Sequence, residues 1–275
     1  MQRALLIKKL VTAAREAGLP SVLLSLYDPK RMVLSTEEEK ACFLAESGLD
    51  VLLSLEENGE LPSSGHAEWI AKELKPKLDI RALVCGEADA EDLQPCGLPL
   101  LPCPMVYGES GRIICRLDLL DRLQQGDLAS YQDLAGRSYA LLGPVVHGAA
   151  LGRKVGQPTA NLAVPEQKIK PPEGVYATLS RVAGGLHMGL TNIGRRPSVD
   201  DSSHITIETY LLDFDQDIYG QTELLELYFP VRGVMKFKGL EEVRAQVQKD
   251  ICNVRAKLSA IYAEQKAGFD KKALV

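Results

Sequence analysis

The pattern of apolar residues changes near Gly136, and this change constrains the fold more than any other feature of the chain. Before it, helical patterns alternate with short apolar runs such as SVLLSLYD (21–28), which is typical of a parallel sheet covered by helices. After it, short strand-like runs are separated by frequent Gly and Pro, which is typical of an antiparallel sandwich or barrel. The sequence therefore predicts two domains, at 1–135 and 136–275.

Local signals place several elements of the first half. Ser35 and Thr36, followed by Glu38 and Glu39, form a capping box and predict a helix that ends near Gly48. The apolar runs that predict further strands are VLLSL (51–55), RALV (81–84) and LPLLP (98–102).

The last segment of the chain returns to a helical pattern. Its apolar residues recur at spacings of three and four, which predicts one amphipathic helix that closes the barrel. These residues are Leu240, Val243, Val247, Ile251, Val254, Leu258 and Ile261.

Charge and composition exclude several classes of protein. The formal net charge is -5, so no nucleic-acid partner is expected, because duplex-binding surfaces carry an excess of basic charge. The longest apolar runs fall short of the roughly 20 residues that a bilayer requires, and the first residues do not form a secretory signal. We expect a cytoplasmic protein with no membrane partner. The six cysteines form no CxxC pair and the four histidines are scattered, so we expect free thiols and no zinc site.

The stretch GPVVHGAALGRKVGQPTANL (143–162) is the most informative for function. Its glycines leave backbone N–H groups able to face a phosphate, but Arg153 and Val155 break the Walker A pattern, and by spacing alone a generic turn fits better. Thr159 and Asn161 lie two residues apart, on one face of an extended segment. Their oxygens suit Mg²⁺, which takes few protein ligands and shares its shell with phosphates and water.

A second candidate is the carboxylate of Glu208 in HITIETYLLDF (204–214). Alternation along a strand places Ile207 and Thr209 on one face and Glu208 on the other, more polar face. On this pattern alone, a solvated carboxylate on a sheet surface is the simpler interpretation.

Taken together in their order, several motifs resemble the riboflavin kinase family over about 136–257. They are G-x-V-x-H-G-x-x-x-G-R-x-x-G-x-P-T-A-N, then PPEGVYA, TNIGRRP, ETYLLDF, IYG and F-P-V-R-x-x-x-K-F. The resemblance implies a six-stranded antiparallel barrel that binds Mg-ATP and riboflavin. It also implies transfer of the γ-phosphoryl group to the ribityl 5′-hydroxyl, which yields FMN and ADP.

The resemblance also implies roles for residues at matching positions. Glu208 would be the catalytic base, and Arg232 would lie near the flavin and its new phosphate. Thr159 and Asn161 would hold Mg²⁺ and bind ATP. The remaining residues implied in ATP binding are Gly148 and Arg153 at the phosphates, and Asp213 and Tyr219 near the nucleotide.

The first half resembles the FMN adenylyltransferase domain that precedes this kinase in bacterial FAD synthetases, with its chemistry lost. The family's T-F-x-P-H-P appears as SLYDPK (25–30), and its G-x-D-F-x-F-G as GEADAE (86–91). Its phosphate motif S-S-T-x-I-R falls on CRLDLL (115–120), where Asp118 would repel a triphosphate. The domain is thus predicted to be a degenerate nucleotidyltransferase-like α/β layer.

The opening strand and the signature G-x-F-D-G-x-H-x-G-H of that family would lie upstream of Met1. Because this strand lies centrally in the family's sheet, we expect a rearranged sheet, or one completed by another chain as a homo-oligomer.

The sequence therefore predicts an ATP-dependent riboflavin kinase with a degenerate first domain. Two alternatives stay open at this point. One is a bifunctional FAD synthetase that retains FMN adenylyltransferase activity, and the other is a flavin-binding module without turnover.

Overall fold

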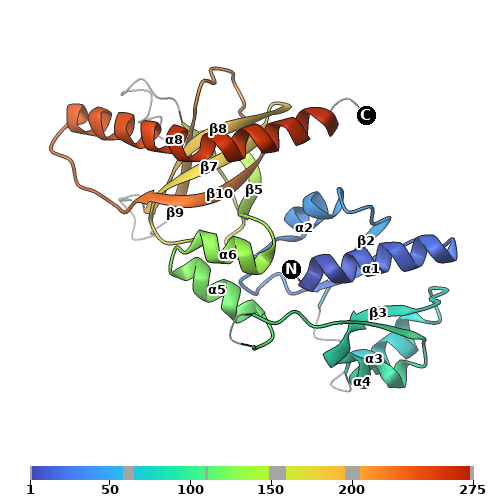
Figure 1. Ribbon diagram of the computed structural model, residues 1–275. Helices are drawn as coiled ribbons and strands as arrows, with labels where there is room; N and C mark the ends of the chain where they lie inside the picture. The colour runs from blue at the N-terminus through green and yellow to red at the C-terminus, as the bar shows by residue number, and fades with distance from the viewer. Residues whose placement is uncertain (1, 58–64, 109–110, 149–158, 196–204, 273–275) are drawn as a thin grey trace. The chain divides into compact units, whose positions relative to one another are not determined.

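The computed structural model describes residues 2–57, 65–108, 111–148, 159–195 and 205–272, in two compact units (Figure 1). Unit 1 comprises Met1–Asp118 and Leu134–Gly136, and unit 2 comprises Leu119–Asp133 and Arg137–Val275. Residues 119–133, which precede the predicted boundary, thus cluster with the second unit. The boundary at 135/136 stays a prediction.

Unit 1 consists of helices and short parallel strands. The strands are β1 (Val22–Tyr27), β2 (Val51–Glu56), β3 (Leu83–Gly86) and β4 (Leu100–Cys103). The helices are α1 (Gln2–Ala17), α2 (Glu37–Leu44), α3 (His66–Trp69) and α4 (Ala90–Leu93), with the π-helix η1 (Ile70–Leu74) and the 3₁₀ helices η2 (Glu87–Asp89) and η3 (Gln94–Cys96).

The sheet of unit 1 is divided. Within the described residues β1 pairs only with β2, and β3 pairs only with β4, both in parallel. The parallel α/β layer predicted from the sequence is confirmed, and it takes the form of two separate pairs. A continuous five-stranded sheet is not formed by this part of the chain. An oligomer formed through the strand edges stays a prediction.

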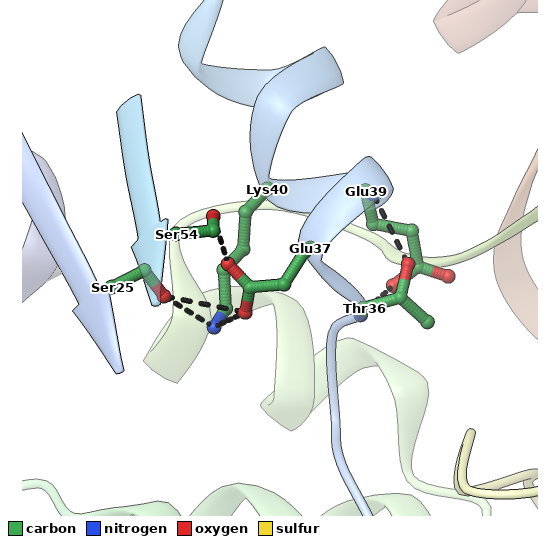
Figure 2. A network of polar contacts seen from close by, with 6 residues as sticks. All are labelled: Ser25, Thr36, Glu37, Glu39, Lys40 and Ser54. Carbon is green, nitrogen blue, oxygen red and sulfur yellow. Dashed lines mark hydrogen bonds and ion pairs between the residues drawn. The ribbon is translucent and has the colours of Figure 1, made fainter. Parts of the chain in front are cut away.

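The capping box of α2 is present as predicted (Figure 2). Thr36 Oγ1 accepts from the backbone N–H of Glu39 at 3.2 Å, and Glu39 Oε2 accepts from the N–H of Thr36 at 3.1 Å. The helix ends at Leu44, earlier than the predicted end near Gly48. Ser47 explains the difference, because its hydroxyl donates to the Leu44 carbonyl at 2.7 Å and competes with continuation of the helix.

A polar network attaches α2 to the β1–β2 pair (Figure 2). The Glu37 carboxylate forms an ion pair with Lys40 and accepts from Ser54 Oγ at 2.6 Å and Ser25 Oγ at 3.2 Å. Ser25 and Ser54 are directly paired across the two strands. Partial burial raises the pKa of Glu37, but the hydrogen bonds from Lys40 and Ser54 outweigh it and lower the pKa. The network therefore holds an ionised carboxylate against the sheet.

Unit 2 is built around a closed barrel in the order β10-β5-β6-β9-β8-β7, with every neighbouring pair antiparallel. This confirms the predicted six-stranded antiparallel barrel. Its strands are β5 (Tyr139–Val146), β6 (Ala160–Leu162), β7 (Gly174–Val182), β8 (Gly185–Arg195), β9 (Ile205–Leu211) and β10 (Thr222–Arg232). The helices of this half of the chain are α5 (Arg116–Gln124), α6 (Leu128–Ala135) and α8 (Leu240–Lys272).

The barrel is closed by pairing of β5 with β10, and α8 packs along its outer face (Figure 1). Val254 and Leu258 of α8 are fully buried against an outer cluster that includes Leu179. The predicted apolar stripe is confirmed from Val247 onward, whereas Leu240 is exposed at the start of the helix. Within the described residues, no helix is long and apolar enough to span a membrane.

Inside the barrel, a ladder of threonine hydroxyls crosses three strands. Thr191 Oγ1 lies 2.9 Å from both Thr178 Oγ1 and Thr209 Oγ1, and all three side chains are fully buried. Because a hydroxyl can both donate and accept, Thr191 can bond to both neighbours, and each of the three hydroxyls has a partner in the ladder. It fixes the pairing of β7, β8 and β9 at this level.

Candidate functional site

Strand pairing brings three predicted site residues onto one row across the barrel. Asn161 pairs with Glu208, and Glu208 pairs with Asn192. The row continues through Val175 to Arg232. Residues that pair directly across strands share a face, and Val175 belongs to the cluster under α8, so this is the outer face. We call these five residues the outer row.

The side chain of Glu208 points to the face predicted from alternation. Its neighbours Ile207 and Thr209 are buried at 2% and 0% exposure and line the barrel interior. Glu208 is half-buried on the other face. The apolar face of β9 is thus the inside of the barrel, and the carboxylate lies on the outside, next to Asn161.

Gly148 packs against the side chain of Asn161. A Cβ atom built on Gly148 would lie 2.1–2.4 Å from the amide atoms of Asn161, so a larger residue does not fit there. Asn161 itself is buried. The close approach explains the need for glycine, and it places Gly148 beside the row. Arg153, predicted at the ATP phosphates, lies outside the described residues.

A pocket of about 220 Å³ lies among strands β5, β6 and β9 and the segment that follows β9. It is lined by Val145, Thr159, Ala160, Thr209, Leu211 and the segment 214–219. Two predicted residues, Thr159 and Tyr219, therefore face the same pocket. Thr159 precedes Asn161 by two residues, whereas Thr209 points to the barrel interior, opposite to Glu208.

Tyr219 is held by a ring contact and a backbone hydrogen bond. It stacks on His147, with ring centroids 3.8 Å apart and an interplanar angle of 30°. Its backbone N–H donates to Asp217 Oδ1 at 3.0 Å. His147 has no role predicted from the sequence, because nothing in the sequence links it to Tyr219, which lies more than 70 positions away.

Arg232 is held by a buried carboxylate of α8. Its Nε donates to Asp250 Oδ2 at 2.7 Å, and Gln246 Nε2 donates to the other oxygen of Asp250 at 2.8 Å. Asp250 is only 3% exposed. The guanidinium also lies 5.6 Å from the ring centroid of Phe237. A buried, doubly bonded carboxylate fixes the orientation of Arg232 on the outer face.

Asp213 lies apart from the pocket lining. Its carboxylate accepts from Arg255 of α8 at 2.7 and 2.8 Å. The hydrogen bond from Arg255 lowers the pKa of Asp213. Its backbone is in the left-handed region with φ 57°, so it forms the turn that leaves β9. Its predicted contact with the nucleotide stays a prediction.

The donor set beside the pocket fits a magnesium ion that shares ligands with a phosphate. Thr159 and Asn161 offer neutral oxygens, and Glu208 offers a carboxylate beside Asn161. No group of three or more His, Cys, Asp and Glu side chains able to hold a metal occurs in the part of the chain that the structure describes. Mg²⁺ needs few protein ligands when phosphate and water complete its octahedron.

Some known proteins match only the second half of the chain, and others match almost all of it. Residues 135–258 match the family model described as Flavokinase, riboflavin kinase. The bifunctional riboflavin kinase/FMN adenylyltransferase of Listeria monocytogenes is 39% identical over 134 residues, which cover 49% of this chain and 43% of that protein. The chain thus spans less than half of this relative, and likewise less than half of the Bacillus subtilis protein of that name.

Two further matches extend over both halves. The Escherichia coli K12 protein with the same name is 29% identical over 273 residues, which cover 91% of this chain and 86% of that protein. A crystal structure described as a macrolide-efflux protein from Streptococcus pneumoniae superposes with a TM-score of 0.77 at 24% identity. It covers 92% of this chain and 89% of its own chain. At that identity the match establishes a shared fold only.

Proposed function

We propose, from the match of residues 135–258 to the flavokinase family model, that the protein is an ATP-dependent riboflavin kinase. It transfers the γ-phosphoryl group of ATP to the 5′-hydroxyl of riboflavin and releases FMN and ADP. The observation that carries this proposal is the pairing of Glu208 with Asn161, two residues from Thr159 in the pocket lining. A carboxylate base and an oxygen ligand for a metal are thereby neighbours across two strands.

Glu208 acts as the general base in this proposal. Phosphoryl transfer needs little covalent chemistry from a protein beyond positioning, charge neutralisation and acceptance of one proton. The half-buried carboxylate accepts the proton of the 5′-hydroxyl of riboflavin. The hydroxyl oxygen attacks the γ-phosphorus, and ADP leaves. Glu208 suits this role because the rigid barrel fixes its backbone on both sides, through β6 and β8.

The pocket takes the base of the nucleotide. At about 220 Å³ it is smaller than a typical site for a whole ligand, about 300–1,000 Å³. It therefore suits an aromatic ring, and the Tyr219 ring offers a stacking face. From there the phosphates extend towards Gly148, whose lack of a side chain lets the backbone approach them. Arg153 is proposed to contact the phosphates as well.

Thr159 and Asn161 are proposed to hold the metal, with Mg²⁺ as the ion that these oxygens suit. When bound, the ion neutralises charge on the transferring phosphoryl group. Thr159 lines the pocket, and Asn161 packs against Gly148 and is paired with Glu208.

Arg232 completes the proposed site from the far end of the row. Its guanidinium, oriented by Asp250, is suited to a phosphate or to an electron-rich ring. We place it near the flavin and the newly formed phosphate. Asp213 is retained as a residue near the nucleotide, acting from the turn after β9.

A second candidate is a bifunctional FAD synthetase, favoured by the match to the Escherichia coli protein over 91% of this chain. One observation in unit 1 weighs against adenylyl transfer. Where the family has phosphate-binding hydroxyls, Asp118 Oδ2 accepts from the backbone N–H of Cys115 at 2.8 Å, at the start of α5. The carboxylate thus occupies the helix N-terminus that would otherwise attract a phosphate.

The test is separation of riboflavin, FMN and FAD by HPLC after incubation of the full chain with riboflavin, ATP and Mg²⁺. We expect FMN without FAD, and loss of FMN formation in Glu208→Gln. Glu264→Gln, on the exposed side of α8, is the control and should keep full activity. FAD in addition to FMN would establish the bifunctional enzyme. Flavin binding without FMN would establish a binding module.

A further inference from the structure

His147 directly follows β5, and its imidazole stacks on the ring of Tyr219, with ring centroids 3.8 Å apart and an interplanar angle of 30°. Tyr219 lines the pocket, whereas His147 is not among the residues that line it. We propose that His147 is a positioning residue that holds the Tyr219 ring in place for the base of the nucleotide. This inference rests on the proposed kinase function, in which the pocket takes that base.

The backbone is fixed on both sides of the stack. The N–H of Val145 donates to the carbonyl of Gln221 at 2.9 Å, and the N–H of Gly220 donates to the carbonyl of Val145 at 2.9 Å. Gly220 has φ 78°, in the left-handed region that favours glycine, so the chain turns directly after Tyr219. His147 and Tyr219 therefore extend from two segments that are already hydrogen-bonded to each other.

The orientation of the Tyr219 ring depends on its side-chain contacts. The preceding residue, Ile218, is buried in an apolar cluster with Val145 and Leu211. Tyr219 packs against this cluster but stays half-buried. A half-buried tyrosine keeps rotamer freedom that ligand binding must remove, and a contact that removes this freedom beforehand strengthens binding. The imidazole of His147 provides such a contact, because stacked aromatic rings attract each other.

Two roles are chemically open to an imidazole at this position. It precedes Gly148, which we place near the phosphates, and its ring nitrogens are able to donate to a phosphate oxygen. The stack favours support of the Tyr219 ring, because a face of the imidazole is packed against that ring. The two roles differ in the part of the nucleotide that they affect. Loss of ring support weakens binding of the base, whereas loss of a phosphate contact weakens binding of the triphosphate.

The test is steady-state kinetics of FMN formation by the full chain, with ADP and inorganic triphosphate as inhibitors competing with ATP. We expect His147→Ala to raise the KM for ATP and the inhibition constant of ADP by about 2- to 10-fold, the range of one aromatic pair. The inhibition constant of triphosphate, the KM for riboflavin and kcat should stay unchanged. His147→Phe keeps a stacking ring and should restore the values for ATP and ADP.

A double-mutant cycle tests whether His147 acts through Tyr219. Tyr219→Ala should raise the inhibition constant of ADP at least as much as His147→Ala does. Adding His147→Ala to Tyr219→Ala should have no further effect, because the ring that His147 supports is already gone. Effects of the two substitutions that add in full would overturn the proposal.

His66→Ala, exposed at the start of α3 in unit 1, is the matched control and should keep all constants. Because His147 is exposed, the thermal melts of its variants should match that of the wild type. An unchanged KM for ATP in His147→Ala, or equal losses for ADP and triphosphate, would overturn the role of His147 and leave the kinase function standing. Absence of FMN with the wild-type protein would overturn both.

Discussion

The strands β1 and β7 have similar apolar character and very different surroundings. In β7 every residue except Arg181 is buried, whereas in β1 no residue is buried and Val22 is exposed. The strand β7 is hydrogen-bonded to β8 and β10 and is covered by α8. Within the described residues β1 pairs only with β2. An apolar strand is thus stabilised by neighbours on both edges and by cover on its face, which its own sequence does not supply.

The proposed chemistry lies entirely on the better-packed of these regions. Asn161, Glu208 and Arg232 come from strands that have partners on both sides in the closed barrel. A closed barrel has no free edge, so it fixes side-chain positions across distant parts of the sequence. The divided sheet of unit 1 offers no comparable scaffold.

The largest expected difference between the two regions is in hydrogen exchange. We expect the backbone amides of β7 and β8 to exchange on the order of 10³-fold more slowly than those of β1 and β2, because exchange reports local opening. Hydrogen–deuterium exchange with peptide-level mass spectrometry measures this. Equal protection in the two regions would mean that the edges of β1 are covered in solution, as an oligomer would cover them.

Matched leucine truncations in β7 and β1 should show the difference in packing as a difference in the free energy of unfolding that each variant loses. Leu179→Ala removes a fully buried side chain of β7 and should cost about 4 kcal/mol. Leu24→Ala removes a half-buried side chain of β1 and should cost about 1 kcal/mol, because less apolar surface returns to water.

Urea unfolding measures both truncations. Far-UV circular dichroism follows the whole chain, and fluorescence of Trp69, the single tryptophan of the chain, follows unit 1. A transition seen by circular dichroism and not by Trp69 reports the barrel. Similar losses in both variants would contradict the difference in packing.

The buried carboxylate of Glu223 should make the stability of the barrel depend on pH. Burial raises the pKa of Glu223 to about 7, only partly opposed by the hydrogen bond from Ser180 Oγ at 2.6 Å. Its Oε2 has no hydrogen-bond partner within the described residues. Because the folded pKa lies above the unfolded value of 4.5, the contribution of Glu223 to stability is fully present below pH 4.5 and is lost as pH rises from 4.5 through 7.

Glu223→Gln removes that charge. The variant should be more stable than the wild type at pH 8 by about 3 kcal/mol, and should match it at pH 4. Thermal melts across this range measure the effect. A constant difference at all pH values would show that the pKa of Glu223 is the same in the folded and the unfolded protein.

The smallest expected effect concerns the network that joins α2 to the divided sheet. Ser54→Ala removes one hydrogen bond to Glu37 and should lower the stability of unit 1 by about 1 kcal/mol. The fluorescence of Trp69 during urea unfolding measures it. Ser259→Ala on α8 is the matched control and should leave this transition unchanged.

Much of the fold could be predicted because its signals are local. The capping box at Thr36 and Glu39 depends on residues three apart, and the stripe of α8 depends on spacings of three and four. The strands of the barrel were marked by turn residues between them. The ladder of Thr178, Thr191 and Thr209 could not be predicted, because it depends on which strands become neighbours.

Only some features of the candidate site could be predicted, because only some of them depend on residues close together in the sequence. The motif predicts roles for Thr159, Asn161 and Glu208 that stay predictions, and alternation gives the correct face of Glu208. Asn192 and His147 were given no role, because their partners Glu208 and Tyr219 are distant in the sequence. Register and ring stacking become visible only when the barrel is closed.

The sequence by itself determined the elements, the change of pattern near Gly136 and the residue types that phosphoryl transfer needs, because each is a property of a short stretch of chain. Only the tertiary structure decided that Asn161, Glu208, Asn192 and Arg232 share one row, and that the apolar strands of unit 1 form two separate pairs. Such decisions depend on hydrogen bonds and packing between strands far apart in the sequence, whose combined free energy no single stretch contains.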